Sequence, residues 1–324
     1  MNHDALLQLF TASPGEYVSG ERISHELGVS RTAIWKQIRK LEAAGYRFEA
    51  SRRLGYRLLS APDFLSAEEL CARMQTERFG RPFQLFDTVD STQNTARAAA
   101  EDGAAEGTLV IAEQQSSGRG RMGRGWISPR GKGIWMSMVL RPSVPIHFAP
   151  QLTLLTAVAL CRSLRRITGL SIGIKWPNDL LIEGKKISGI LLESAAEDER
   201  LKYIIAGIGI SVNLEENDYP DELKDKATSL RIAGGRKLDR TEVIAGFLKE
   251  WEQLYELYRE QGFGPIVTLW EALSVSLGKK VRLITPQGDV AGTPVALEES
   301  GAIRVRLDDG SHKSVFSAEM GEPL

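Results

Sequence analysis

Hydrophobic positions in the first sixty residues recur at the spacing of short helices and then alternate. The apolar positions of three predicted helices are Leu6, Leu7 and Phe10, then Ile23 and Leu27, then Ile34, Ile38 and Leu41. Pro14–Gly15 is expected to end the first helix, Gly28 follows the second, and Ser30 is expected to cap the third. After Gly45, residues 46–59 alternate as two strands around a basic turn. The pattern predicts three helices followed by a hairpin.

Charge on this predicted unit favours a nucleic-acid surface. Residues 30–57 carry eight basic side chains and two acidic ones. The order of elements resembles a winged helix-turn-helix, whose second helix fits the major groove and whose hairpin meets backbone phosphates. A small helical interaction module with an incidental basic face is the alternative. The residues expected to face DNA are Ser30, Arg31, Thr32, Trp35, Lys36, Arg39, Arg52 and Arg53.

From about residue 65 to 270, helical and strand patterns alternate. Strands are predicted at 83–89, 107–115, 133–142, 172–176, 179–183, 186–195 and 200–213, and helices at 91–103 and 149–169. Within 133–142, Ile134, Met136, Met138 and Leu140 set an alternating pattern. The hairpin turns at 183–186 and 197–200 are too short for helical crossovers. We therefore expect an α/β (α+β) domain with a mixed or largely antiparallel sheet.

Short strands with QG, SG and DG turns fill the last fifty residues. They are predicted at 279–286, 289–299, 302–309 and 312–320 and suggest a small SH3-like β-barrel of five or six strands. The Ala61–Pro62 dipeptide is expected to be a linker. The predicted domains are therefore 1–62, 63–274 and 275–324.

Composition excludes several classes of protein. The 324 residues include 41 Lys and Arg against 42 Asp and Glu, so the net charge is −1 and a polycation that coats nucleic acid is excluded. No apolar run reaches the roughly 18 residues of a membrane span, and the N-terminus lacks the basic region of a signal peptide. Cys71 and Cys161 are too few and too far apart for a disulfide framework or a cysteine zinc site. We expect a cytoplasmic protein without a membrane partner.

The sharpest motif is GRGRMGRGW at residues 118–126. It opens a second basic segment, 118–132, which has five basic side chains and no acidic one. Alternating glycine and arginine provide backbone amides and guanidinium groups for a phosphate or carboxylate. A disordered arginine-glycine tract is the alternative, but such tracts are usually long and repeated. A second motif, KWPNDLLIEGKKISGILLE at 175–193, would alone be an ordinary hairpin. The glycines of 207–213 permit close approach by a ligand.

Together the two long motifs resemble the biotin–protein ligases, and the N-terminal unit is similar to that of the members that also repress the biotin operon. The resemblance covers essentially the whole chain. It implies a class II synthetase-like central domain that forms biotinyl-5′-adenylate from biotin and Mg-ATP. It further implies transfer of biotin to a lysine of the biotin carboxyl carrier protein of acetyl-CoA carboxylase, or of other biotin-dependent carboxylases. The implied repressor is an adenylate-bound homodimer on operator DNA.

The resemblance also implies roles for particular residues. Those matching catalytic positions are Arg119, Arg121 and Lys186. Those matching biotin-binding positions are Ser91, Thr92, Gln93, Gln115, Arg119, Gly120, Arg121, Lys186 and Gly189. Those matching nucleotide-binding positions are Gly118, Trp126, Lys175, Asn178, Asp179, Ser211 and Asn213. The resemblance assigns no metal ligand.

Two positions depart from the family's pattern. Gln93 and Ser211 each stand where asparagine is usual. Two rival functions remain open at this stage. One is a biotin-sensing repressor with little ligase activity, against which Arg119, Arg121 and Lys186 argue. The other is a lipoate-type acyl ligase, against which the glycine-arginine loop and Gln115 argue.

Overall fold

The computed structural model describes residues 3–13, 15–43, 45–60, 63–197 and 200–323. The chain divides into two compact units, Met1–Phe64 and Leu65–Leu324. Pro14, the linker dipeptide Ala61–Pro62 and the centre of the turn at 197–200 lie outside the described residues. The division into three domains at 62/63 and 274/275 stays a prediction.

The N-terminal unit has the predicted helices and hairpin. Its elements are α1 (His3–Thr11), β1 (Tyr17–Val18), α2 (Gly20–Leu27), α3 (Arg31–Ala43), β2 (Arg47–Ser51) and β3 (Gly55–Ser60). The two-residue β1 was not predicted; it pairs with β3 and gives the antiparallel order β1-β3-β2. Gly28 ends α2 with φ of 64°, a conformation that glycine adopts without strain. The apolar positions predicted from the spacing form its core.

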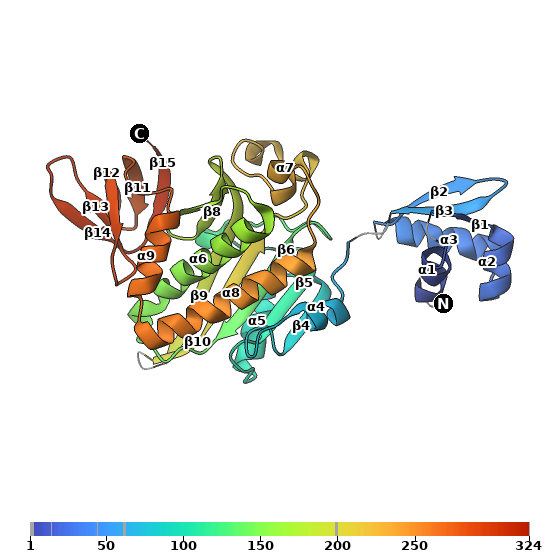
Figure 1. The fold of residues 1–324 in the computed structure, drawn as a ribbon, viewed down its shortest axis with the longest axis horizontal. Helices are drawn as coiled ribbons and strands as arrows, with labels where there is room; N and C mark the ends of the chain where they lie inside the picture. Colours follow the sequence, from blue (N-terminus) through green and yellow to red (C-terminus); the bar gives the residue numbers. More distant parts are fainter. Residues whose placement is uncertain (1–2, 14, 44, 61–62, 198–199, 324) are drawn as a thin grey trace. The chain divides into compact units, whose positions relative to one another are not determined.

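A seven-stranded mixed sheet forms the centre of the second unit (Figure 1). In spatial order its strands are β4 (Phe83–Val89), β5 (Leu109–Gln115), β6 (Ile134–Leu140), β10 (Arg200–Ile210), β9 (Lys185–Glu197), β8 (Asp179–Ile182) and β7 (Gly173–Lys175). Only the β4–β5 pair is parallel, and the other described pairs are antiparallel. The predicted mixed sheet is confirmed.

Helices cover both faces of this sheet (Figure 1). They are α4 (Ala67–Arg73), α5 (Thr92–Glu101), α6 (Ala149–Thr168), α7 (Leu230–Gly234), α8 (Arg240–Gln261) and α9 (Gly264–Leu273), with 3₁₀ turns η1 (Arg121–Gly123), η2 (Ile146–Phe148), η3 (Glu216–Asp218) and η4 (Asp221–Leu223). The large core lies between the sheet and α6, α8 and α9, while α5 covers part of the opposite face. No helix in the described ranges is long and apolar enough to span a membrane.

The side-chain pattern of β10 explains where a cavity forms. Ile204, Ala206 and Ile208 belong to the large core, and Ile205 packs on the α5 side. Because side chains alternate along a strand, Gly207 and Gly209 face the same side as Ile205. Neither glycine has a side chain to fill the space beyond α5. Side chains from other elements, or a ligand, can therefore approach the backbone of the sheet here.

Strand β6 has the predicted alternation, and it is buried on both faces. Its seven residues are all buried. Met136 and its alternating partners enter the large core, whereas Trp135 and Val139 belong to two smaller clusters on the opposite face. Because other elements cover both faces of this central strand, apolar side chains can occupy both faces.

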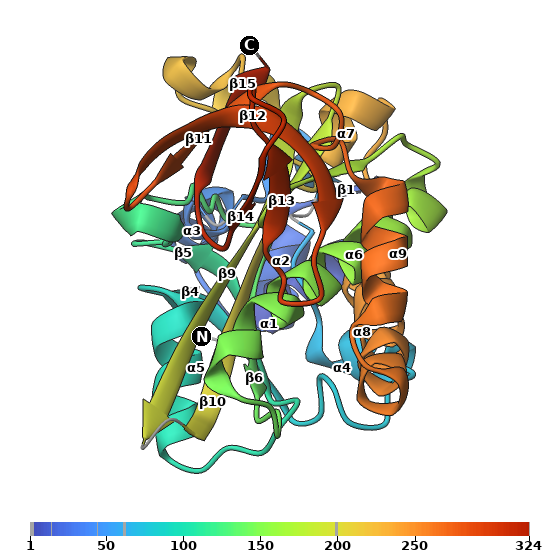
Figure 2. The same cartoon turned by 90° about the vertical axis from the view of Figure 1, so that its left-hand side faces the viewer.

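The C-terminal residues form a five-stranded antiparallel sheet that curves strongly (Figure 2). Its strands are β11 (Val281–Thr285), β12 (Gly288–Leu297), β13 (Ile303–Arg306), β14 (His312–Val315) and β15 (Glu319–Pro323), in the order β14-β13-β12-β11-β15. Val281, Leu283 and Met320 share one core cluster with the central sheet. The small all-β module is confirmed, and it packs directly on the central sheet.

Candidate functional site

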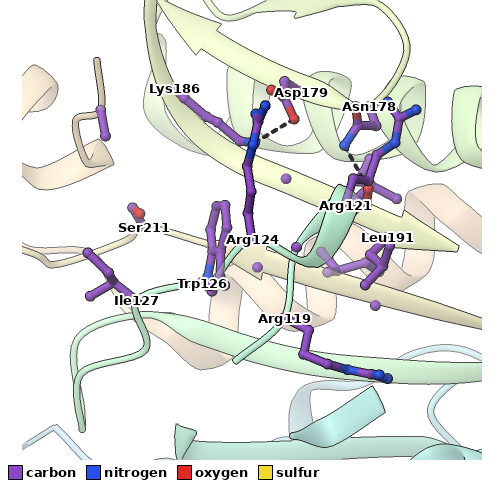
Figure 3. Close-up of a pocket in the computed structure, with 18 of the residues that line it drawn as sticks. Arg119, Arg121, Arg124, Trp126, Ile127, Asn178, Asp179, Lys186, Leu191 and Ser211 are labelled. Carbon is purple, nitrogen blue, oxygen red and sulfur yellow. Dashed lines mark hydrogen bonds and ion pairs between the residues drawn. The ribbon is translucent and has the colours of Figure 1, made fainter. Parts of the chain in front are cut away.

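One cavity of about 720 Å³ opens over the sheet at Gly207 and Gly209 (Figure 3). Its walls come from the start of α5, the end of β5, the glycine-arginine loop, β8, β9, β10, the segment 214–227 and the start of β15. Every residue predicted to bind biotin lines it, namely Ser91, Thr92, Gln93, Gln115, Arg119, Gly120, Arg121, Lys186 and Gly189. Residues 98 positions apart in sequence therefore meet in one place.

The glycine-arginine loop is ordered by its own backbone. The Trp126 amide donates to the Gly118 carbonyl at 2.8 Å, and the Gly120 amide donates to the Arg124 carbonyl at 2.7 Å. A Cβ atom on Gly118 would lie 2.4 Å from the Trp126 carbonyl oxygen, so glycine is required there. The loop is a small hairpin, and the disordered-tract alternative is wrong.

Arg121 reaches into the cavity and is held by two elements. Its Nη1 donates to Asn178 Oδ1 at 3.0 Å, and its Nη2 donates to Ser317 Oγ at 3.3 Å. Burial lowers the pKa of this guanidinium, against the opposing charges of Asp179 and Glu319. Arginine remains protonated in proteins near neutral pH. The cavity therefore contains a fixed, half-buried cation that suits an anionic group.

Arg119 does not point to the same place as Arg121 (Figure 3). Its Nη2 donates to Glu193 on β9 at 2.9 Å, and Glu193 also pairs with Arg97 on α5 at 3.0 Å. The side chain is exposed at the edge of the cavity. Two of the three arginines of the motif therefore point to different places, and of these two Arg121 is the one that reaches into the cavity.

Lys186 and Trp126 form the wall opposite Arg121. Lys186 Nζ lies 2.7 Å from Asp179 Oδ1 and 5.3 Å from the centre of the Trp126 ring. The ring lies over the cross-strand pair Gly189 and Gly209, where added Cβ atoms would come within 3.0 and 2.5 Å of it. These glycines allow the protein's own Trp126 side chain to lie against the sheet, whereas the sequence predicted close approach by a ligand.

Uncharged polar groups line the end of the cavity beside α5. Gln115 Oε1 accepts from the Thr92 amide at 2.9 Å, and Gln115 Nε2 donates to Ser128 Oγ at 2.8 Å. Ser91 caps α5 by accepting from the Gln93 amide at 3.3 Å. A neutral donor–acceptor set at one end and cations at the other suit an elongated ligand with a polar ring and a carboxylate.

Only some of the residues predicted to bind a nucleotide line the cavity. Trp126, Lys175, Asn178, Asp179 and Ser211 line the cavity, and Gly118 and Asn213 do not. The Asn213 prediction needs correction. Its amide is engaged with Leu238, donating to the carbonyl and accepting from the backbone amide, both at 2.9 Å. Asn213 therefore anchors the segment that follows α7.

A metal ion would depend on ligands from a substrate. No group of three or more His, Cys, Asp or Glu side chains that could hold a metal occurs in the described parts of the chain. Magnesium usually needs only one or two carboxylates when substrate phosphates and water supply the rest. Asp179 lines the cavity beside Lys186 and meets that requirement.

Comparison with known proteins agrees with this geometry. The chain matches the Biotin/lipoate A/B protein ligase family over residues 85–211, an HTH domain over 2–57 and the biotin protein ligase C-terminal domain over 276–320. It is 45% identical to the bifunctional ligase/repressor BirA of Bacillus subtilis (strain 168) across 97% of each chain. This chain belongs to the biotin–protein ligase family.

More distant members of the family are similar over most of the chain. The bifunctional ligase/repressor BirA of Escherichia coli (strain K12) is 28% identical over 94% of this chain and 95% of its own length. The biotin protein ligase of Aquifex aeolicus, solved in complex with biotin and ATP, is 33% identical with a TM-score of 0.64. That match covers 74% of this chain and 97% of the other. Sequence and structure thus lead to one family.

The N-terminal unit presents a basic surface. All eight residues predicted to face DNA are exposed, on α3, at Ser30 directly before it, or at the tip of the β2–β3 hairpin. Ser30 Oγ accepts from the Ala33 amide at 3.3 Å, which confirms the predicted cap. The Arg39 guanidinium lies 5.6 Å from the Trp35 ring and pairs with Glu42.

Several residues of this biotin–protein ligase cavity escaped the sequence prediction. Ser137 is the one polar residue in the apolar strand 134–140, and that isolation is a signal that sequence reading could have used. Tyr219 lines the cavity, and burial raises its pKa to about 12. Glu319 pairs with Arg124, whose hydrogen bond lowers the pKa of that carboxyl. No local pattern indicates either of these last two.

Proposed function

We propose that this protein ligates biotin to a lysine of a carrier protein in two steps at the cavity described. In the first, a biotin carboxylate oxygen attacks the α-phosphorus of ATP and pyrophosphate leaves. In the second, the lysine amine attacks the acyl carbon and AMP leaves. The observation that carries the proposal is the joining of a neutral polar end, a half-buried Arg121 and the Lys186–Asp179 pair in one cavity.

Each group has a role that its position supports. Ser91, Thr92 and Gln115 bind the ureido ring, while Arg121 and Lys186 stabilise charge on the carboxylate and α-phosphoryl group. Asp179 would hold a Mg²⁺ ion bound with ATP, and that ion would supply further positive charge. Trp126 and the rest of the loop exclude water from the adenylate, a mixed anhydride that hydrolyses readily. A reaction that consumes ATP agrees with the cytoplasmic location expected from the sequence.

The decisive experiment incubates the protein with labelled biotin, ATP, magnesium and the carrier domain of acetyl-CoA carboxylase. Label on the carrier lysine supports the proposal. Adenylate formation without transfer would favour a biotin-sensing repressor with little ligase activity. Transfer of lipoate in preference to biotin would favour the lipoate-type ligase instead.

We further propose that α3 and the β2–β3 hairpin bind operator DNA. The double replacement of Arg31 and Lys36 by alanine is expected to abolish specific binding, because both side chains are exposed on α3. Binding measured by fluorescence anisotropy at fixed salt checks this. Ligation by the same variant should stay within twofold of the parent. An equal fall in both activities would contradict separate surfaces.

A homodimer is proposed from an open strand edge. Strand β9 pairs with β10 along Ser188–Glu197, but β8 pairs with β9 only over 185–189. Within the described residues no strand pairs with the outer edge of 191–197, and such edges join a second strand readily. We propose that adenylate orders 118–132 and 214–226 and promotes pairing of two copies at this edge.

A lysine on the open edge should prevent this pairing. Ala196 is exposed, and Ala196→Lys places like charges together at a two-fold interface. We expect the dimer dissociation constant, measured by sedimentation with adenylate bound, to rise at least about tenfold. Ligation should be unaffected. An unchanged dissociation constant would rule out this edge as the interface.

A further inference from the structure

Gln93, one of the two departures from the family pattern, is buried and fully engaged by the protein. Its side chain is 3% exposed. Gln93 Nε2 donates to the Leu191 carbonyl on β9 at 3.2 Å and to the Ile205 carbonyl on β10 at 3.1 Å. Both amide protons are therefore used, and this fixes the orientation of the amide. Gln93 Oε1 is left as an acceptor only.

That orientation fixes the direction of the next hydrogen bonds. Ser137 Oγ donates its single proton to Gln93 Oε1 at 3.0 Å. Ser137 Oγ also lies 2.9 Å from Thr92 Oγ1, so Thr92 is the donor in that contact. The other near acceptor of the Thr92 hydroxyl, Gln115 Oε1 at 3.1 Å, also belongs to the protein. The Thr92 proton is thus used within the protein and is not offered to a ligand.

A hydroxyl held in this way offers only lone pairs to a ligand. Thr92 Oγ1 then accepts from an N–H group and rejects a carbonyl oxygen. Gln115 instead offers a donor to a ligand. Its Oε1 accepts from the Thr92 amide, and one of the two Nε2 protons bonds to Ser128, so the other Nε2 proton remains. An acceptor beside a donor matches the N–H and C=O of a cyclic urea.

The length of the Gln93 side chain is matched to the absence of a Cβ atom at Gly207 on β10. A Cβ atom on Gly207 would lie 2.4 Å from Gln93 Oε1 and 3.2 Å from its Cδ. Alanine at 207 would therefore displace the amide that orients Ser137. Asparagine at 93, shorter by one methylene group, would leave room for that Cβ.

We propose that Gln93 is a positioning residue, paired in size with Gly207, that orients the Thr92 hydroxyl through Ser137. This role replaces the direct biotin contact expected from the resemblance. The inference deepens the proposed ligase function and rests on it. Through Thr92, we infer, Gln93, Ser137 and Gly207 make the α5 end of the cavity prefer a ligand ring that presents an N–H group.

The test compares Gly207→Ala, Gln93→Asn and the double variant in the full-length protein. Gly207→Ala should raise the KM for biotin about tenfold, the effect of one misdirected hydrogen bond. The KM for ATP should stay within twofold. In the double variant the KM for biotin should return to within about threefold of that of Gln93→Asn alone, since contacting residues are coupled.

The outcomes separate this inference from the function itself. A parent protein that does not ligate biotin would refute the function, whereas the inference is tested by calorimetric biotin binding among the variants. If the double variant is as impaired as Gly207→Ala or worse, Gln93 and Gly207 are not a matched pair and the inference is overturned. Equal rises in the KM for biotin and for ATP would overturn it too, by indicating a general structural effect.

Ser137→Ala provides a second test that does not depend on Gly207→Ala folding. It should raise the KM for biotin several-fold and leave kcat and the KM for ATP nearly unchanged. Ser163→Ala is the matched control, because Ser163 Oγ is also buried and has no hydrogen-bond partner among the described residues. An unchanged KM for biotin in Ser137→Ala would overturn the proposal.

Discussion

Replacing Arg121 with alanine is expected to slow biotin ligation by about 100- to 1,000-fold, the usual effect of removing a preorganised charge-stabilising donor. The guanidinium is half-buried and fixed by Asn178 and Ser317. It therefore needs little reorganisation when charge develops beside it. Adenylate should also be released or hydrolysed faster, because the loop loses its hydrogen bonds to Asn178 and to Ser317, which precedes β15. Quenched-flow measurement of adenylate formation and transfer checks both effects.

Arg130→Ala is the matched control for this loss. Arg130 lies in the same basic segment, pairs with Asp87 and does not line the cavity. We expect its ligation rate to stay within about threefold of the parent, since exposed ion pairs contribute little. Arg121→Lys should recover only part of the activity, because an ammonium cannot reproduce the two-pronged guanidinium geometry. Unchanged adenylate retention in Arg121→Ala would show that the loop has been assigned to the wrong part of the reaction.

Local sequence predicted the loop well because its chemistry is local. Glycines at 118 and 120 and the arginine between them specify a tight, cation-bearing hairpin without reference to the rest of the chain. The direction of each arginine was not predictable in this way. Arg119 turns toward Glu193, which is 74 residues away in sequence. Only the register of β9 beside α5 puts that carboxylate within reach.

The same limit applies to residues whose role depends on a distant partner. The resemblance assigned Asn213 to the nucleotide, but its side-chain amide is hydrogen-bonded to the backbone of Leu238 at both its nitrogen and its oxygen. Gln93 looked like a departure from the family, and Gly207 gives it room. The burial of both faces of β6 was not predictable from its alternation, because elements far away in the chain cover them. Sequence spacing carries no information about such long-range partners.

Arg240→Ala is expected to give the largest loss of stability, about 3–5 kcal/mol in the free energy of unfolding. The Arg240 side chain is 1% exposed and pairs through both terminal nitrogens with Glu113, at 2.9 and 3.1 Å. It also donates to the Gly133 carbonyl at 2.9 Å. Without it, a buried carboxylate and a buried carbonyl each lose a charged donor. Chemical denaturation followed by circular dichroism measures the change.

The neighbouring Arg73–Asp239 pair gives a control in the same region. It joins α4 to the residue before Arg240, but its side chains are 46% and 38% exposed. Water therefore screens the attraction, and Arg73→Ala should cost less than about 1 kcal/mol. If both replacements cost the same, burial would not be what makes the Arg240–Glu113 pair important. Glu113 lies two residues before Gln115 on β5, so losing the pair should also raise the KM for biotin by loosening that end of the cavity.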